Sequence, residues 1–201
     1  MKLSIQYLEM AKRNNDVNFD DKLKRVSSTL IDQIDKLSSI ASEFSNFAKM
    51  PIAKRKRVNV VEVLMQCVTL FDKSEEVDIS VDKNGIKEYY IYADGEQLIS
   101  VFNNLLQNAI QSIPSKRKGI IHVNLKQDDK TITIEIKDNG KGISEIAQEK
   151  LFIPNFTTKS SGMGLGLAIV QNIVKNSQGE IWFETQVDEG STFYVRFPMY
   201  E

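Results

Sequence analysis

The chain has 201 residues, 41% of them hydrophobic, and its 26 lysines and arginines nearly balance its 27 aspartates and glutamates. That length suits one domain with a smaller companion, and a net charge of −1 argues against the broad positive field of a nucleic-acid-binding protein. The single cysteine, Cys67, excludes an intrachain disulfide, and no apolar run reaches the ~18 residues of a membrane span. We therefore expect a cytoplasmic fragment with no nucleic-acid partner. A membrane-anchored parent stays open.

The first 50 residues are predicted to form a helical hairpin. A turn is expected at 14–18, followed by a long helix from a cap at Asp20 or Asp21 to about Lys49. Apolar residues recur along this helix at steps of three and four, which gives one seam: Leu23, Val26, Leu30, Ile34, Leu37, Ala41, Phe44 and Phe47. One hairpin has too few helices to bury the seam, so we expect a homodimer with a four-helix bundle. A coiled-coil handle without further function is the alternative.

Residues 51–58 are predicted to be a linker, because Pro51 stops the helix and the basic run 54–57 is typical of a solvated hinge. A second domain is predicted at 59–201. Helices are expected at 60–72 with Asn59 as cap, from the cap Asp94 to about Ile113, at 144–151 and at 164–177 with Gly179 as stop. Strands are expected at 77–81, 89–92, 120–125, 131–136, 180–186 and 191–198. This order predicts the α+β class, an α/β sandwich with helices on one face of a mixed, mostly antiparallel sheet.

The segment 138–143, Asp-Asn-Gly-Lys-Gly-Ile, follows the predicted strand 131–136. Gly140 and Gly142 have no Cβ, so the backbone can approach a flat ligand closely. Asp138 is placed to accept a hydrogen bond from an exocyclic amine. The alternative is a strand that ends in a glycine turn.

Two more segments carry polar or glycine patterns. Asn104 and Asn108 lie one turn apart, away from the apolar stripe of their predicted helix, and an amide oxygen suits Mg²⁺, which takes hard oxygen ligands and phosphates. Two solvated asparagines are the alternative. The segment 162–167, Gly-Met-Gly-Leu-Gly-Leu, opens the next predicted helix, where backbone N–H groups and the helix dipole favour phosphate. It lacks the Lys-Ser/Thr ending of a Walker loop.

Together with Phe-Thr-Thr-Lys at 156–159 and Gly-Ser-Thr-Phe at 190–193, these segments resemble the ATP-binding domain of sensor histidine kinases over residues 57–201. That fold is shared with gyrase, heat-shock chaperone and mismatch-repair ATPases. The segment 151–159 resembles the lid of the nitrogen-sensing branch. The resemblance implies binding of ATP and Mg, with these contacts to the nucleotide: Asn104, Asn108, Asp138, Gly140, Gly142, Ile143, Phe152, Thr158, Lys159, Gly162, Gly164, Leu165, Gly166, Leu167 and Thr192.

The resemblance also implies individual roles. Asn108 would be the metal ligand, and Asn104 would assist at the phosphates. Asp138 would accept from the adenine amino group, with Thr192 in support. Lys159 would meet the γ-phosphate as a point charge.

The hairpin resembles the dimerisation and phosphoacceptor hairpin of the same kinases. Residues 1–6 resemble the helix just after the phosphoacceptor motif, so we expect the hairpin to be truncated at its start. The histidine, acid and Asn-Pro-Leu of that motif are absent. The one histidine, His122, shares a strand face with Asn124 and is interpreted as a partly exposed strand residue. We expect no catalytic residue in this chain and no autophosphorylation of the chain alone.

The resemblance implies a parent protein-histidine kinase that transfers the γ-phosphoryl of Mg-ATP to a histidine and on to an aspartate of a response-regulator receiver domain. A nucleotide-gated interaction module without phosphoryl transfer is the alternative. An ATPase of the chaperone or mismatch-repair type would need a water-activating acid on the asparagine helix. Glu96 is too far upstream, and Leu105 and Gln107 occupy the nearby turn, so the sequence argues against this third class.

Overall fold

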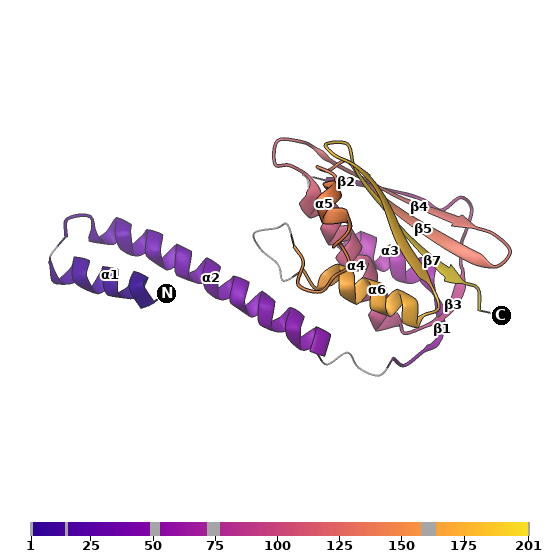
Figure 1. Ribbon diagram of the computed structural model, residues 1–201, viewed down its shortest axis with the longest axis horizontal. Coiled ribbons are helices and arrows are strands. Elements are labelled where there is room, and N and C mark those ends of the chain that lie inside the picture. The colour runs from indigo at the N-terminus through magenta and orange to yellow at the C-terminus, as the bar shows by residue number, and fades with distance from the viewer. Residues whose placement is uncertain (1, 15, 49–52, 72–76, 158–163, 201) are drawn as a thin grey trace.

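The computed structural model describes residues 2–14, 16–48, 53–71, 77–157 and 164–200 (Figure 1). It begins with a hairpin of two helices, α1 (Lys2–Arg13) and α2 (Phe19–Ala48). The predicted cap at Asp20 or Asp21 is wrong. The first helical hydrogen bond runs from Lys22 N–H to the Asn18 carbonyl at 3.0 Å. Both aspartates therefore lie in the first turn, where their charge faces the positive end of the helix dipole.

Few side chains of the hairpin are covered. Among those described, only Ala11 is buried. Leu23, Ile34 and Leu37 of the predicted seam are 40%, 54% and 50% exposed, and Val26 and Leu30 are half-buried. Asp16 in the connecting turn pairs with Lys22. That hydrogen bond, with help from the Asn18 N–H, lowers the pKa of the Asp16 carboxyl. The side chains of Ala41, Phe44 and Phe47 lie outside the described part of the seam.

The α/β part begins with a strand that the sequence analysis missed. β1 (Lys56–Asn59) pairs antiparallel with β3 (Tyr90–Ala93), although its residues 56–58 fall in the predicted linker. Only Val58 in this strand is buried. The segment therefore lacks the alternation of apolar residues that would predict a strand. The Arg57 guanidinium lies 3.7 Å from the centroid of the Tyr90 ring, which turns part of the basic run into a packing contact.

A five-stranded sheet forms the body of the α/β part. Its order is β2-β4-β5-β7-β6, and only the β2–β4 pair is parallel. The strands are β2 (Val77–Asp82), β4 (Gly119–Gln127), β5 (Thr131–Asp138), β6 (Glu180–Gln186) and β7 (Gly190–Pro198). The predicted class, helices with a mixed, mostly antiparallel sheet, is confirmed.

Helices cover one face of this sheet (Figure 1). They are α3 (Val60–Phe71), α4 (Gly95–Ser112) and α6 (Gly166–Asn176), with the short α5 (Glu145–Gln148) at one end. Asp94 caps α4 as predicted, since its Oδ1 accepts from the N–H groups of Glu96 and Gln97. The predicted stripe of α4 is buried: Leu98, Val101, Phe102, Leu105, Leu106 and Ala109. Within the described residues, no helix has the length and hydropathy that crossing a membrane requires.

Two helices differ in detail from the prediction. α5 ends at Gln148, and 149–152 continue as turns. The C-terminus of α6 is closed by Gly179 N–H donating to the Val174 carbonyl (2.9 Å) and Gln178 N–H to the Lys175 carbonyl (3.0 Å). The left-handed residue of this Schellman motif is Gln178, at φ 59°. Gly179 is required for another reason, because a Cβ there would overlap the Arg196 carbonyl oxygen.

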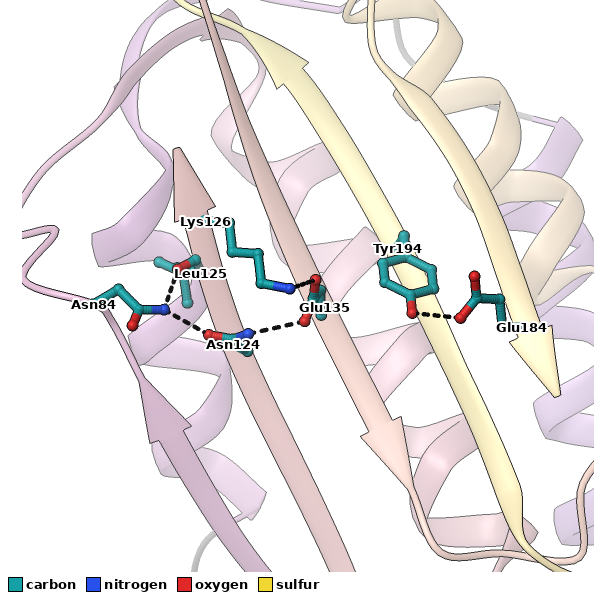
Figure 2. A network of polar contacts seen from close by, with 7 residues as sticks. All are labelled: Asn84, Asn124, Leu125, Lys126, Glu135, Glu184 and Tyr194. Carbon is teal, nitrogen blue, oxygen red and sulfur yellow. Dashed lines mark hydrogen bonds and ion pairs between the residues drawn. The ribbon is translucent and has the colours of Figure 1, made fainter. Parts of the chain in front are cut away.

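The outer face of the sheet carries polar side chains that pair across strands (Figure 2). Asn124 donates to Glu135 at 2.9 Å and accepts from Asn84 at 2.8 Å. Tyr194 donates to Glu184 at 2.8 Å, and burial, followed by this hydrogen bond, raises the pKa of the Tyr194 phenol to about 12. His122 lies on the same face, is exposed, and contacts Ser80 Oγ through Nδ1, which confirms its prediction as an exposed strand residue.

Candidate functional site

Asp138, the last residue of β5, is a buried carboxylate at the edge of the helical layer, with 2% of its surface exposed. Its Oδ1 accepts from Ser112 Oγ and from the Gly140 N–H, both at 2.8 Å. A carboxylate that accepts two hydrogen bonds keeps a defined orientation. The structure therefore holds Asp138 in a fixed position between the sheet and the C-terminal end of α4.

The two glycines after Asp138 are required by the packing of the loop itself. A Cβ on Gly140 would overlap Ser112 Oγ. Gly142 has a φ of 67°, which favours glycine, and a Cβ there would overlap the Gln186 carbonyl oxygen. The sequence predicts that these glycines let a flat ligand approach the backbone. In the structure, protein atoms already fill the space where a Cβ of each would lie.

Arg117 ties the same loop together and was not singled out in the sequence. Its Nη1 donates to the carbonyls of Asn139 (2.6 Å), Gly140 (3.1 Å) and Asp188 (3.1 Å). A basic residue in a hydrophilic loop carries no signal for such a role. Ile143, at the end of the Asp-Gly segment, is anchored by its N–H donating to Thr185 Oγ1 at 3.0 Å.

The strand register separates Thr192 from Asp138. Thr192 pairs with Lys137, whereas Ser191 pairs with Asp138. Since successive side chains of a strand point to opposite faces, Thr192 lies on the outer face and Ser191 on the face of Asp138. The structure therefore does not bring Thr192 to the other predicted residues. Ser191 is buried, and its Oγ lies 2.9 Å from Thr185 Oγ1.

Asn104 and Asn108 lie on the same stripe of α4 as Ser112, at steps of four residues. The three positions span about 12 Å of helix. Asn104 donates to the Ser100 carbonyl at 2.8 Å, and a Cβ on Gly166 would overlap Asn104 Oδ1. The N-terminus of α6 is therefore packed against Asn104, and Asp138 is packed against Ser112 at the other end of the stripe.

The glycine loop is described from Gly164 onward. Gly164 has a φ of 67°, and a Cβ there would overlap the Phe156 carbonyl oxygen. Leu165, the residue before α6, is buried and makes no side-chain capping hydrogen bond. Leu167 packs against the core. The first N–H groups of α6 thus carry the partial positive charge of a helix N-terminus.

The predicted lid is described only in part. Phe152 is half-buried, with its ring centroid 6.1 Å from that of Phe183 on β6. Thr158, Lys159 and Gly162 lie outside the described residues.

A cavity of about 470 Å³ lies at the opposite end of α6 from Gly166. It is lined by Lys175, Gly179, Glu180, Ile181, Trp182 and Arg196. Two of these lining residues, Arg196 and Glu180, form an ion pair. None of the predicted site residues lines this cavity, so it is separate from the stripe between Asp138 and α6.

The chain is similar to known proteins over most of its length. Residues 93–201 match the family of histidine kinase-, DNA gyrase B-, and HSP90-like ATPases. The chain is 29% identical to sporulation kinase A of Bacillus subtilis (strain 168) over 197 residues, which are 96% of this chain and 31% of that protein. The chain spans less than half the length of the curated relatives it matches.

Two solved structures show the same fold. The catalytic domain of histidine kinase ThkA matches with a TM-score of 0.64 and 27% identity, over 73% of this chain and 96% of that one. ThkA in complex with response regulator protein TrrA matches with a TM-score of 0.75 and 22% identity, over 98% of this chain and 57% of that one. The chain therefore belongs to the histidine kinase-, DNA gyrase B-, and HSP90-like ATPase family, and its relatives in that family are sensor histidine kinases.

Proposed function

We propose that the chain binds Mg-ATP along the α4 stripe, with the base at Asp138 and the phosphates at the N-terminus of α6. The observation that carries this proposal is the placement of a buried carboxylate and a helix N-terminus at the two ends of one polar stripe. A carboxylate suits the exocyclic amine of adenine, and a helix N-terminus suits phosphate. The residues present fit the nucleotide that an ATPase family implies.

Asn108 is the proposed magnesium ligand. It lies midway along the stripe, between Asn104 and Ser112, and is half-buried. Mg²⁺ keeps several waters and takes phosphate oxygens as partners, so a single neutral amide oxygen is a sufficient protein ligand. Asn104, which touches Gly166, is the proposed contact to the phosphates.

The remaining contacts stay as proposed from the sequence, with one replacement. Ser191 takes the place of Thr192 beside the adenine, because it shares a face with Asp138. Phe152 anchors the lid, and Lys159 meets the γ-phosphate. The other proposed contacts are Gly140, Gly142, Ile143, Thr158, Gly162, Gly164, Leu165, Gly166 and Leu167.

The parent of this chain is proposed to be a sensor histidine kinase with a hairpin at about 1–50, a linker and an ATP-binding domain from about residue 59. It would transfer the γ-phosphoryl group to a histidine and on to a receiver domain. A solved relative is in complex with a response regulator protein, which supports such a partner here. The open seam of α2 supports a homodimer through the hairpin, since an apolar stripe of this length favours burial against a second copy.

A titration with a fluorescent ATP analogue tests nucleotide binding. Asp138→Asn keeps an oxygen for Ser112 and Gly140 but replaces the other oxygen by an amide N–H₂, which repels the adenine amine. We expect a loss of ~1.5–3 kcal/mol, roughly ten- to a hundredfold in affinity. Thr192→Val is the matched control, because Thr192 lies on the outer face. Equal affinities of wild type and Asp138→Asn would refute the proposal.

The nucleotide-gated module without phosphoryl transfer is the competing function. The two are separated by incubating γ-labelled ATP with a longer chain of the parent, followed by acid treatment. Acid-labile label on the longer chain supports a kinase. Nucleotide binding without label on any longer chain supports the module.

A further inference from the structure

Thr185 on β6 belongs to a row of polar side chains that crosses the sheet beside the Asp-Gly loop. The register pairs Asp138 on β5 with Ser191 on β7, and Ser191 with Thr185. Paired residues of neighbouring strands point to the same face, so the three side chains share the face that the helices cover. The next row on this face is apolar and consists of Ile136, Phe193 and Phe183. The polar row therefore lies where the core ends and the proposed site begins.

The Thr185 hydroxyl contacts groups from two other segments of the chain. Its Oγ1 lies 3.0 Å from the Ile143 nitrogen, 3.0 Å from the Gly190 carbonyl oxygen and 2.9 Å from Ser191 Oγ. A hydroxyl has one proton and two lone pairs. Because an N–H only donates and a carbonyl only accepts, Thr185 gives its proton to Gly190 and accepts from Ile143 and Ser191. These three bonds use the whole bonding capacity of the hydroxyl and fix its orientation.

Two of these three partners, Ile143 and Ser191, are proposed contacts to the nucleotide. The Ile143 N–H differs from the other amides of its loop. Asn139 and Lys141 donate to backbone carbonyls of neighbouring segments, at 3.2 Å and 3.0 Å, whereas Ile143 donates to a side chain. The position of this end of the loop therefore depends on the residue type at 185.

We propose that Thr185 is a positioning residue for ATP binding, whose hydroxyl holds Ile143 and Ser191 in place beside Asp138. This inference rests on the proposed binding of ATP at Asp138. Thr185 acts through its two partners and need not touch the nucleotide. Its third partner, Gly190, is packed closely on the same site, since a Cβ on Gly190 would overlap the Asp138 carbonyl oxygen.

The test is the fluorescent ATP titration on Thr185→Val, which keeps the shape of the side chain and removes the hydroxyl. The Ile143 N–H and Ser191 Oγ then lose their partner, and ATP has to order both groups when it binds. The Ile143 carbonyl keeps its bond from Gln148 Nε2, at 2.9 Å, so we expect a partial loss of affinity, about tenfold.

Thr185→Ser restores the hydroxyl and should bind ATP within about twofold of the wild type. Thr133→Val is the matched control. It makes the same exchange on β5, where Thr133 points to the outer face because its neighbours Ile132 and Ile134 are buried. The control should leave ATP affinity unchanged.

Amide hydrogen exchange separates a local role from a general loss of stability. In Thr185→Val the Ile143 amide should exchange faster, whereas the Asn139 and Lys141 amides should keep their wild-type rates. Equal acceleration of all three amides would overturn the inference. If Thr185→Val does not fold, Thr185→Cys decides, because a thiol is a weak donor and acceptor. Its ATP affinity should fall below that of Thr185→Ser, and an affinity equal to the wild type would overturn the inference.

The remaining outcomes separate this inference from the proposed function. A folded Thr185→Val with unchanged ATP affinity, or a Thr185→Ser that binds as weakly as Thr185→Val, overturns the positioning role and leaves the proposed function standing. Failure of the wild type to bind ATP refutes the proposed function itself, and the inference with it.

Discussion

The helical hairpin and the α/β part solve the same problem of burial in different ways. In the α/β part, the apolar stripes of α3, α4 and α6 close against one face of a sheet, and Phe102 and Phe197 have no exposed surface. In the hairpin, Ile34 and Leu37 stay half-exposed because α1 and α2 have no third element among the described residues to pack on. The α/β part therefore carries its own core, whereas the hairpin leaves apolar side chains exposed, which is the basis of the proposed dimer.

The largest expected effect is in the core of the α/β part. Phe102→Ala removes a fully buried ring from α4 and should destabilise this part by about 3–5 kcal/mol. Urea unfolding followed by Trp182 fluorescence measures the loss, because Trp182 lies on β6 of the same sheet. Ile146→Ala, on an exposed α5 residue, is the control. A loss below about 1 kcal/mol for Phe102→Ala would contradict a self-contained core.

The matching change in the hairpin tests whether the seam is an interface. Ile34→Asp places a charge in the seam of each chain, and the loss of two apolar contacts of ~1.5 kcal/mol each should weaken a dimer about a hundredfold. Sedimentation over a concentration series measures the shift toward monomer. Glu9→Gln on α1 is the control. A wild type that is monomeric at all concentrations would show that the seam is not covered by a second copy.

A smaller effect is expected at the edge of the α/β part, where an exposed side chain closes the Asp-Gly loop. Arg117→Ala removes donors to three carbonyls and should lower stability by about 1 kcal/mol. Because the loop holds Asp138, ATP affinity should also fall by about fivefold. Lys116→Ala is the adjacent control, and the same fluorescent titration reads both variants. An unchanged affinity for Arg117→Ala would show that the loop keeps its shape without this clamp.

The smallest expected effect is a pH dependence of the unfolding free energy of the α/β part. Burial raises the pKa of the Cys67 thiol to about 11, from an ordinary value of 9.0. The folded state therefore holds its proton longer than the unfolded state, and this stability is present below pH 9 and is lost as the pH rises toward 11. The difference in unfolding free energy between wild type and Cys67→Ala should narrow by less than about 1 kcal/mol between pH 8 and pH 9.5. A difference that widens would contradict the burial of the thiol.

Several features of the chain follow from local sequence alone. Asp94 caps α4 because an acid before an apolar stripe satisfies the first N–H groups of a helix. The alternation of Ile132, Ile134 and Ile136 defines β5 and its buried face. The roles expected of Asp138, Asn104 and Asn108 came from the family resemblance, whereas their places at a strand end and on one stripe of a helix follow from spacing within a single element.

Only the tertiary structure decided how distant segments meet. β1 was missed because its pairing with β3 depends on residues more than 30 positions away, and its own sequence is basic. Ser191, and not Thr192, shares the face of Asp138 because the β5–β7 register sets which of two neighbours points inward. Ser112 and Arg117 join the candidate site in the same way. Folding brings the Asp138 carboxylate beside the Ser112 hydroxyl and the Gly140 carbonyl beside the Arg117 guanidinium.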